Sequence, residues 1–145
     1  MNHKLERELL SYWLPPEELL LSEWADNYAY LSPESSGVQG TWRTIPYQQG
    51  IMDEFISPAS EMVTVMKSAR VGYTKMVNWD TGYHIHHAPC SQLIVQPTED
   101  DAQGYSRDEL ETMIRDIPVL TKLVADAKSR DSGNTIKRKI RSLKL

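Results

Sequence analysis

Two short runs of β-forming residues, each followed by a stretch of helical character, constrain the fold of this chain more than any other feature. The first run is EMVTVMK (residues 61–67), and the second is SQLIVQP (residues 91–97). Short apolar runs of this kind are typical of strands that are buried on both faces of a sheet. Because such strands alternate here with longer helices, the sequence predicts an α/β fold with a parallel sheet and right-handed crossovers.

The length and composition limit the chain to one compact unit. It has 145 residues, of which 40% are hydrophobic and 25% are charged, and this is enough for one domain but not for two. No apolar run approaches the roughly 18 residues that span a bilayer. The charged start MNHKLERELL lacks the apolar stretch of a signal peptide, and the single cysteine, Cys90, fits a reducing compartment. We therefore expect a protein of the cell interior that makes no membrane contact.

Charge is distributed unevenly along the chain. Seven basic residues and one acid lie between Lys128 and the C-terminus, whereas residues 1–127 hold nine basic and nineteen acidic residues. The net charge of −4 argues against a protein built mainly to coat nucleic acid. A basic tail contacts phosphate backbones through charge alone, although a solvated, partly disordered end is the commoner meaning of such a run.

Local signals divide the chain into three parts, which are a helical arm with a strap (1–44), a core (45–127) and a basic tail (128–145). In the arm, a helix over residues 5–14 stops at a Pro-Pro pair, and a second helix over 19–31 has Ser22 as its N-cap. A strap rich in Ser, Gly and Pro then leads to the core.

Four helical stretches are predicted in the core. Pro46 opens the first, with its apolar residues on one face; the second runs to about His87. Ser106 and Glu109 form a capping-box pair before the third, and the fourth covers 118–128. The predicted core is therefore a partial three-layer arrangement, with helices on both faces of a short parallel sheet.

The junction between the first predicted strand and the next helix resembles a phosphate-binding loop. The usual motif is G-x-x-x-x-G-K-[ST], and here the same spacing reads K-x-x-x-x-G-Y-T, with Lys67 in place of the first glycine. Gly72 permits phosphates to approach backbone N–H groups at a helix N-terminus, and the Thr74 hydroxyl suits Mg²⁺. Either Lys67 or Lys75 is placed to supply the cation. The alternative interpretation is a tight turn with two surface lysines. The predicted ATP-binding segment comprises Lys67, Ser68, Ala69, Arg70, Val71, Gly72, Tyr73, Thr74 and Lys75.

Two further segments favour nucleotide chemistry. Tyr47 and Gln48 open the helix before the first predicted strand; a glutamine amide there is able to read adenine, and an aromatic ring beside it is able to stack on the base. The segment LIVQPTEDDA (93–102) resembles the end of the second core strand in nucleic-acid translocases. The alternatives are an ordinary amphipathic helix start for the first, and a strand, a turn and an N-cap for the second.

Seven segments in order carry a family resemblance. They are LSPESS (31–36), GTW (40–42), PYQQGIMD (46–53), MKSARVGYTKM (66–76), GYHIHH (82–87), LIVQPTEDDA (93–102) and IRDIPVL (114–120). This set resembles the N-terminal part of the ATPase domain in the large terminase subunit of tailed bacteriophages, in its lambda-type branch. The resemblance covers about residues 20–135, and the deviant phosphate loop is itself a hallmark of that branch.

The resemblance implies ATP-driven packaging of viral DNA into a preformed capsid, with a nuclease domain that cuts the DNA concatemer. It implies ATP and Mg²⁺ as cofactors, with Lys67 as the displaced phosphate-loop lysine and Thr74 as the metal position. The implied partners are double-stranded viral DNA, the small terminase subunit through the N-terminal arm, and the capsid portal. The implied location is the cytoplasm of the bacterial host.

Departures from the family pattern leave the enzymatic status of this chain open. Hydrolysis needs an acidic pair at the end of a later strand, and no hydrophobic run here ends in Asp-Glu; the nuclease carboxylates are absent too. After Thr135 the sequence IKRKIRSLKL leaves the family pattern. We therefore expect a truncated motor fragment that holds nucleotide weakly. The alternatives are a non-catalytic module that binds DNA or a partner, and an inactive prophage remnant.

Two other groups of residues have simpler interpretations. His84, His86 and His87 with Cys90 suggest zinc, but their spacing matches no usual tetrahedral site, and histidines at a helix C-terminus complement its dipole. The four tryptophans, Trp13, Trp24, Trp42 and Trp79, are expected to be packing anchors, with stacking on adenine as a lesser alternative for Trp42. Met62, Met66 and Met76 are expected to fill the core.

Overall fold

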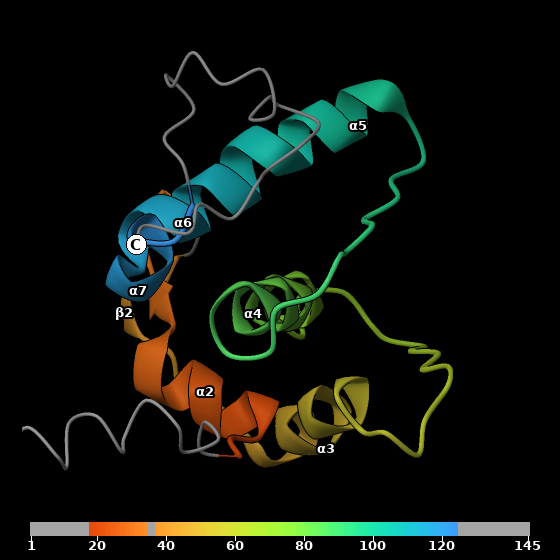
Figure 1. The fold of residues 1–145 in the computed structure, drawn as a ribbon. Helices are drawn as coiled ribbons and strands as arrows, with labels where there is room; N and C mark the ends of the chain where they lie inside the picture. The colour runs from red at the N-terminus through yellow and green to blue at the C-terminus, as the bar shows by residue number, and fades with distance from the viewer. Residues whose placement is uncertain (1–17, 35–36, 125–145) are drawn as a thin grey trace, which may run out of the picture.

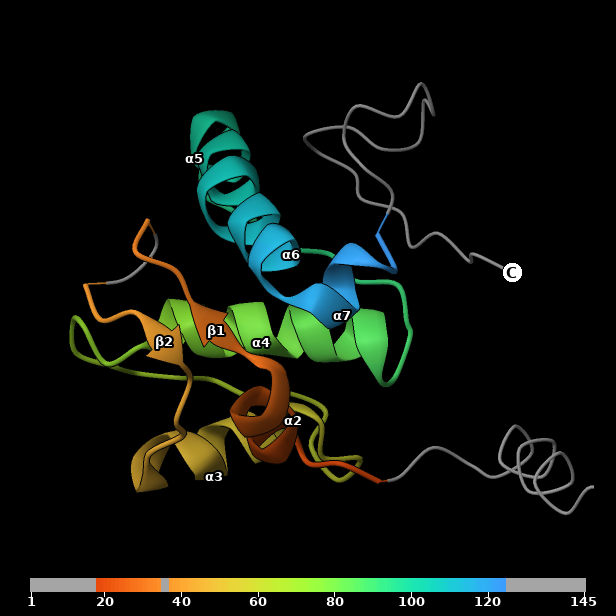
Figure 2. The ribbon, with the colours of Figure 1, turned by 90° about the vertical axis from the view of Figure 1, so that its left-hand side faces the viewer.

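The computed structural model of this chain describes residues 18–34 and 37–124. Its regular elements, in chain order, are α2 (Leu21–Tyr28), β1 (Tyr30–Leu31), β2 (Gly40–Thr41), α3 (Pro46–Phe55), α4 (Tyr73–His86), α5 (Glu99–Gly104), the π-helix η1 (Tyr105–Glu111), α6 (Thr112–Asp116) and α7 (Pro118–Thr121). Helix α4 lies at the centre, between α2 and α3 on one side and the α5–α7 segment on the other (Figures 1 and 2). No helix within the described ranges is long and apolar enough to cross a membrane.

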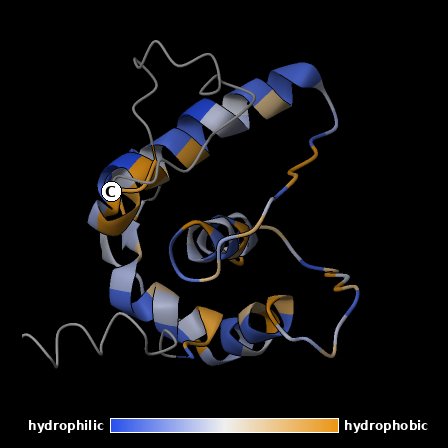
Figure 3. Ribbon diagram, in the orientation of Figure 1, coloured by the Kyte–Doolittle hydropathy of each residue, from blue (hydrophilic) through white to orange (hydrophobic). Residues whose placement is uncertain are grey.

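The central position of α4 is reflected in the burial of its large side chains. Met76, Trp79 and Tyr83 recur at a spacing of three and four residues, so they share one face of the helix. Gly82 brings α4 close to α2, since a Cβ atom at this position would lie only 2.7 Å from the ring of Trp24. The helix therefore contacts α2 and α3 on one side and α6 and α7 on the other, and Figure 3 shows how the hydropathy of residues varies over these helices.

The described tryptophans anchor this core, as the sequence predicts. Trp24, Trp42 and Trp79 are all buried. The rings of Trp42 and Trp79 meet edge to face with their centroids 5.7 Å apart, and the indole N–H of Trp42 donates to Thr44 Oγ1 at 2.9 Å. Trp42 is thus a core residue, and its ring is not presented for stacking on a base. Trp13 lies outside the described residues.

The predicted parallel sheet is not confirmed. Within the described ranges, the sheet consists of β1 and β2, which pair antiparallel with Tyr30 opposite Thr41 and Leu31 opposite Gly40. A backbone bond from Trp42 N–H to Ala29 O (3.0 Å) extends this contact. The observed architecture is therefore a mixed helical fold with one small antiparallel sheet.

The two predicted strands, 61–67 and 91–97, are not confirmed as strands, and most of their apolar side chains are exposed. Neither has strand pairing. The side chain of Met66 is 100% exposed and that of Leu93 is 88% exposed, so Met62 and Met66 do not fill the core, whereas Met76 does. A β-forming run becomes a strand only when another strand satisfies its backbone N–H and C=O groups. Within the described ranges, no such neighbour lies beside either run.

Helix α3 begins at Pro46 as predicted, but the predicted N-cap of α2 is wrong. Leu20 holds the N-cap position with extended backbone, and its N–H donates to Glu23 Oε2 at 3.0 Å. Ser22 lies inside the helix, buried, and its N–H donates to Asp53 Oδ1 at 3.0 Å. The Asp53 carboxylate of α3 therefore accepts the hydrogen bond of a first-turn N–H group, which is the role that the side chain of an N-cap serine usually has.

The third helical stretch starts earlier than predicted. Helices α5, η1 and α6 form one continuous helical run, and Thr98 caps it by accepting from Asp101 N–H at 3.1 Å. The predicted capping pair Ser106 and Glu109 therefore lies inside the helix. Helix α7 begins at Pro118 as predicted and ends at Thr121. The tail 128–145 and the first arm helix lie outside the described residues.

Candidate functional site

The loop before α4 turns sharply into the helix through two left-handed residues. Arg70 has φ +62°, and Gly72, the N-cap of α4, has φ +80°. A Cβ atom at Gly72 would lie 2.8 Å from Gln48 Nε2. Glycine is therefore required here both for the backbone conformation and for the close approach of α3.

Tyr47 and Gln48 contact this loop directly. The Tyr47 hydroxyl and the Gln48 side-chain amide both donate to the Val71 carbonyl, each at 3.1 Å. Gln48 is only 5% exposed, and its Oε1 accepts from Ile45 N–H at 3.3 Å. The structure thus brings the two predicted segments together, and both ends of the Gln48 amide are already bonded to protein.

The start of α4 is suited to an anion. No side chain caps the helix, and its first turn contains no acidic residue. The free N–H groups and the positive end of the helix dipole therefore face the end of the loop. Thr74, the second residue of α4, is exposed.

The predicted cations take different positions around this helix start. The Lys67 ammonium lies over the Tyr73 ring, 5.6 Å from its centroid, and Lys67 is exposed, as are Ser68, Ala69 and Arg70. Lys75 instead points to η1, where its Nζ lies 2.5 Å from Glu109 Oε2. Lys67 therefore remains in solvent at the loop, whereas Lys75 is held in an ion pair.

A polar network that the sequence does not reveal joins α4 to η1. Glu109 Oε2 also accepts from Asn78 Nδ2 at 2.7 Å, and Asn78 Oδ1 accepts from the Tyr105 hydroxyl at 2.6 Å. Burial, and then the charges of Glu109 and Asp80, raise the pKa of Tyr105 to about 12. The i, i+3 spacing of Lys75 and Asn78 places both on one face of α4, but it does not indicate which residues of η1 they meet.

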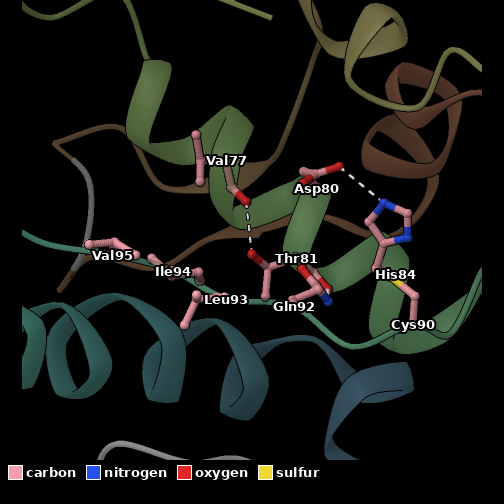
Figure 4. A pocket seen from close by; sticks show the side chains of 9 residues that line it. All are labelled: Val77, Asp80, Thr81, His84, Cys90, Gln92, Leu93, Ile94 and Val95. Carbon is pink, nitrogen blue, oxygen red and sulfur yellow. Dashed lines mark hydrogen bonds and ion pairs between the residues drawn. The ribbon is translucent and has the colours of Figure 1, made fainter. Parts of the chain in front are cut away.

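A groove of about 430 Å³ lies along the far half of α4 (Figure 4). Its lining residues are Val77, Asp80, Thr81, His84, Cys90, Gln92, Leu93, Ile94 and Val95. Burial raises the pKa of the Asp80 carboxyl, and His84, with Nε2 3.5 Å from Asp80 Oδ1, partly offsets the effect. The unpaired run 91–97 thus forms one wall of this groove.

His86 and Thr98 make contacts that hold the fold together. His86 Nδ1 lies 3.0 Å from Trp24 Nε1, and since an indole N–H only donates, this nitrogen is the acceptor. Among the described residues no group of three metal-ligating side chains is close enough to hold a metal ion. Thr98 is the N-cap described above, and Glu99 and Asp100 after it are exposed.

The comparisons with known proteins give the class of this chain. The family model described as "Phage terminase large subunit gpA, ATPase domain" matches residues 36–142. This match covers most of the chain, which therefore belongs to that family.

Two curated relatives narrow the likeness to lambda-type phages. The chain is 42% identical over 125 residues to the "Terminase, large subunit" of Escherichia phage lambda, and 38% identical over 125 residues to that of Enterobacteria phage P21. Each alignment covers 85% of this chain and 20% of the relative, so the chain spans about a fifth of the length of these proteins. No solved structure matches the chain.

Proposed function

We propose that this chain is the nucleotide-binding portion of a phage DNA-packaging ATPase, and that it binds the triphosphate of ATP at residues 67–75. The observation that carries the proposal is the left-handed Gly72 at the uncapped start of α4, with the exposed ammonium of Lys67 beside it. This is the arrangement that phosphate binding requires. Membership of the terminase ATPase family supports ATP as the ligand.

Each residue of the proposed site has a distinct role. Lys67 leaves the Tyr73 ring to reach the β- and γ-phosphates, and the α4 amides beyond Gly72 bind phosphate oxygens. Thr74 fits Mg²⁺ because it is an exposed hydroxyl-bearing residue at the second position of the helix, and Mg²⁺ takes most of its ligands from phosphate and water. Bound Mg²⁺ would neutralise phosphate charge.

Adenine binding by Tyr47 and Gln48 demands a local exchange of hydrogen bonds. Both side chains donate to Val71 O, so Gln48 must release this carbonyl to read the base. Tyr47 remains half exposed and offers a ring face for stacking. We propose binding without turnover.

The test is a titration of the chain with the non-hydrolysable analogue AMP-PNP in the presence of Mg²⁺, in which binding is measured by isothermal calorimetry. We expect Lys67→Ala to weaken binding by about tenfold or more, because one charge-assisted phosphate contact is lost. Lys122→Ala is the matched control, since Lys122 is exposed and lies at the end of α7. Equal affinity of Lys67→Ala and the unchanged protein would refute the site.

We further propose that the runs 61–67 and 91–97 become parallel strands of the ATPase sheet when further strands of a terminase ATPase domain pair with them. Their β-forming composition and their exposed apolar side chains support this. We expect the chain to co-purify with a polypeptide that carries the remaining ATPase strands. Leu93→Lys should abolish this pairing without destabilising the chain alone; retained pairing would argue against the proposal.

The remaining roles concern partners in the bacterial cytoplasm. We propose that the arm (1–44) meets the small terminase subunit, that the tail (128–145) contacts the phosphates of viral DNA, and that a capsid portal receives the assembled motor. Deletion of residues 1–30 should abolish small-subunit pairing. Deletion of residues 136–145 should flatten the salt dependence of DNA binding, and an unchanged slope would exclude the tail.

A further inference from the structure

The ion pair between Lys75 and Glu109 joins two helices that are distant in sequence. The side chains are 14% and 25% exposed, and Lys75 Nζ lies 2.5 Å from Glu109 Oε2. Lys75 sits in the first turn of α4, two residues after the helix begins. A lysine at the proposed phosphate site is therefore bound to a carboxylate of η1, in surroundings that screen the charges less than open water does.

Glu109 is held firmly for this contact. The same oxygen accepts from Asn78, which is 1% exposed, and Asn78 in turn accepts from Tyr105. Tyr105 and Glu109 both belong to η1. A π-helical turn carries an extra residue compared with an α-helical turn, and here it sets both side chains against α4.

The contrast with Lys67 defines the role of the pair. Lys67 is exposed, and within the described part of the chain its ammonium lies over the face of the Tyr73 ring. Its ammonium is free to meet phosphate without breaking an ion pair, whereas the Lys75 ammonium must first leave Glu109.

We infer that Glu109 is a positioning residue that holds Lys75 away from the phosphates, so that nucleotide phosphate and Glu109 compete for one ammonium. This inference rests on the proposed nucleotide site and adds its regulation. Phosphate binding to Lys75 frees Glu109 and loosens η1 from α4. Because a ligand shifts an equilibrium only through its different affinity for two states, loss of the Glu109 charge must tighten nucleotide binding.

The experiment compares the full chain with Glu109→Gln, in which the side-chain shape and an acceptor for Asn78 remain. Asp108→Asn is the matched control, because Asp108 is an exposed acid of the same element. The probe is AMP-PNP with Mg²⁺. We expect Glu109→Gln to bind at least about threefold more tightly than the unchanged chain, and Asp108→Asn to bind equally. Lys75→Ala should abolish the gain in the double variant.

Hydrogen exchange gives a second readout that needs no variant. Amides of η1 in the unchanged chain should exchange faster when AMP-PNP is bound, since the Lys75 contact is then lost. Two results overturn this inference and leave the proposed nucleotide site standing. One is that Glu109→Gln binds AMP-PNP no more tightly than the unchanged chain. The other is that the exchange of the η1 amides stays the same in a chain that binds nucleotide through Lys67. Failure of the unchanged chain to bind AMP-PNP overturns the proposed nucleotide site and this inference with it.

Discussion

Substitution of Gly72 by alanine tests the geometry on which the nucleotide site depends. Alanine in the left-handed conformation costs about 1–2 kcal/mol, and Gly72 has φ +80°. The new Cβ would also lie 2.8 Å from Gln48 Nε2, so Gln48 must move from Val71 O and Ile45 N–H. Loss of these buried bonds costs about a further 1–2 kcal/mol.

We therefore expect Gly72→Ala to lower the free energy of unfolding by about 2–4 kcal/mol. For a domain of about 100 residues this is a fall in Tm of roughly 10–25 °C. Urea denaturation followed by circular dichroism measures the change. The matched control is Gly50→Ala, in the middle of α3 with no atom within 4 Å of the new Cβ; it should stabilise the chain by about 0.5–1 kcal/mol.

The cause of the loss is tested by a second change. Gln48→Ala removes the side chain that the new Cβ meets, so the double variant with Gly72→Ala should be more stable than the sum of the single effects allows, by about 1 kcal/mol. Additive effects, or a Gly72→Ala chain as stable as the unchanged protein, would refute the reasoning.

Three other expectations follow from packing and burial. Gly82→Ala should destabilise the chain by about 1–3 kcal/mol in urea, because its Cβ would overlap Trp24 at 2.7 Å; an unchanged midpoint would contradict this. Asp80→Asn should stabilise the chain at pH 7, since burial raises the pKa of Asp80 and so disfavours its charge. This gain should vanish as pH falls through the raised pKa, where Asp80 is neutral; a gain that persists in acid would count against the cause. Because the pKa of Tyr105 is raised to about 12, the folded chain keeps a proton that the unfolded chain loses above about pH 10. Stability should therefore fall between about pH 10 and 12, and Tyr105→Phe should make this slope shallower in alkaline urea titrations; the rest of the slope comes from Tyr83, whose pKa is also raised by burial.

Helices with strong local signals are predicted correctly from the sequence. Pro46 fixes the start of α3 through its restricted φ, and α4 ends near His87 as expected. The sequence also predicts that Tyr47 and Gln48 act together with the phosphate-loop segment, but only because both are expected to bind the same nucleotide. Their direct bonds to Val71 O depend on how α3 packs against the loop.

The predictions that the structure does not bear out have a common physical origin. The runs 61–67 and 91–97 have β-forming composition, but strand pairing needs a neighbour that local composition does not supply. The capping pair at Ser106 and Glu109 follows a familiar spacing, yet Thr98 already begins that helix. In each case the local pattern is present in the sequence, but contacts with other parts of the fold determine which structure it forms.

The order of chemistry-bearing segments, the glycine at the start of α4 and membership of the terminase family are determined by the sequence itself, because each depends on residue identity and spacing. The tertiary structure decides which partner each side chain takes. Lys75 meets Glu109, 34 positions away, and Gln48 meets Val71, 23 positions away. Such pairs form only when packing of the core brings the helices together, and no local pattern in the chain encodes them.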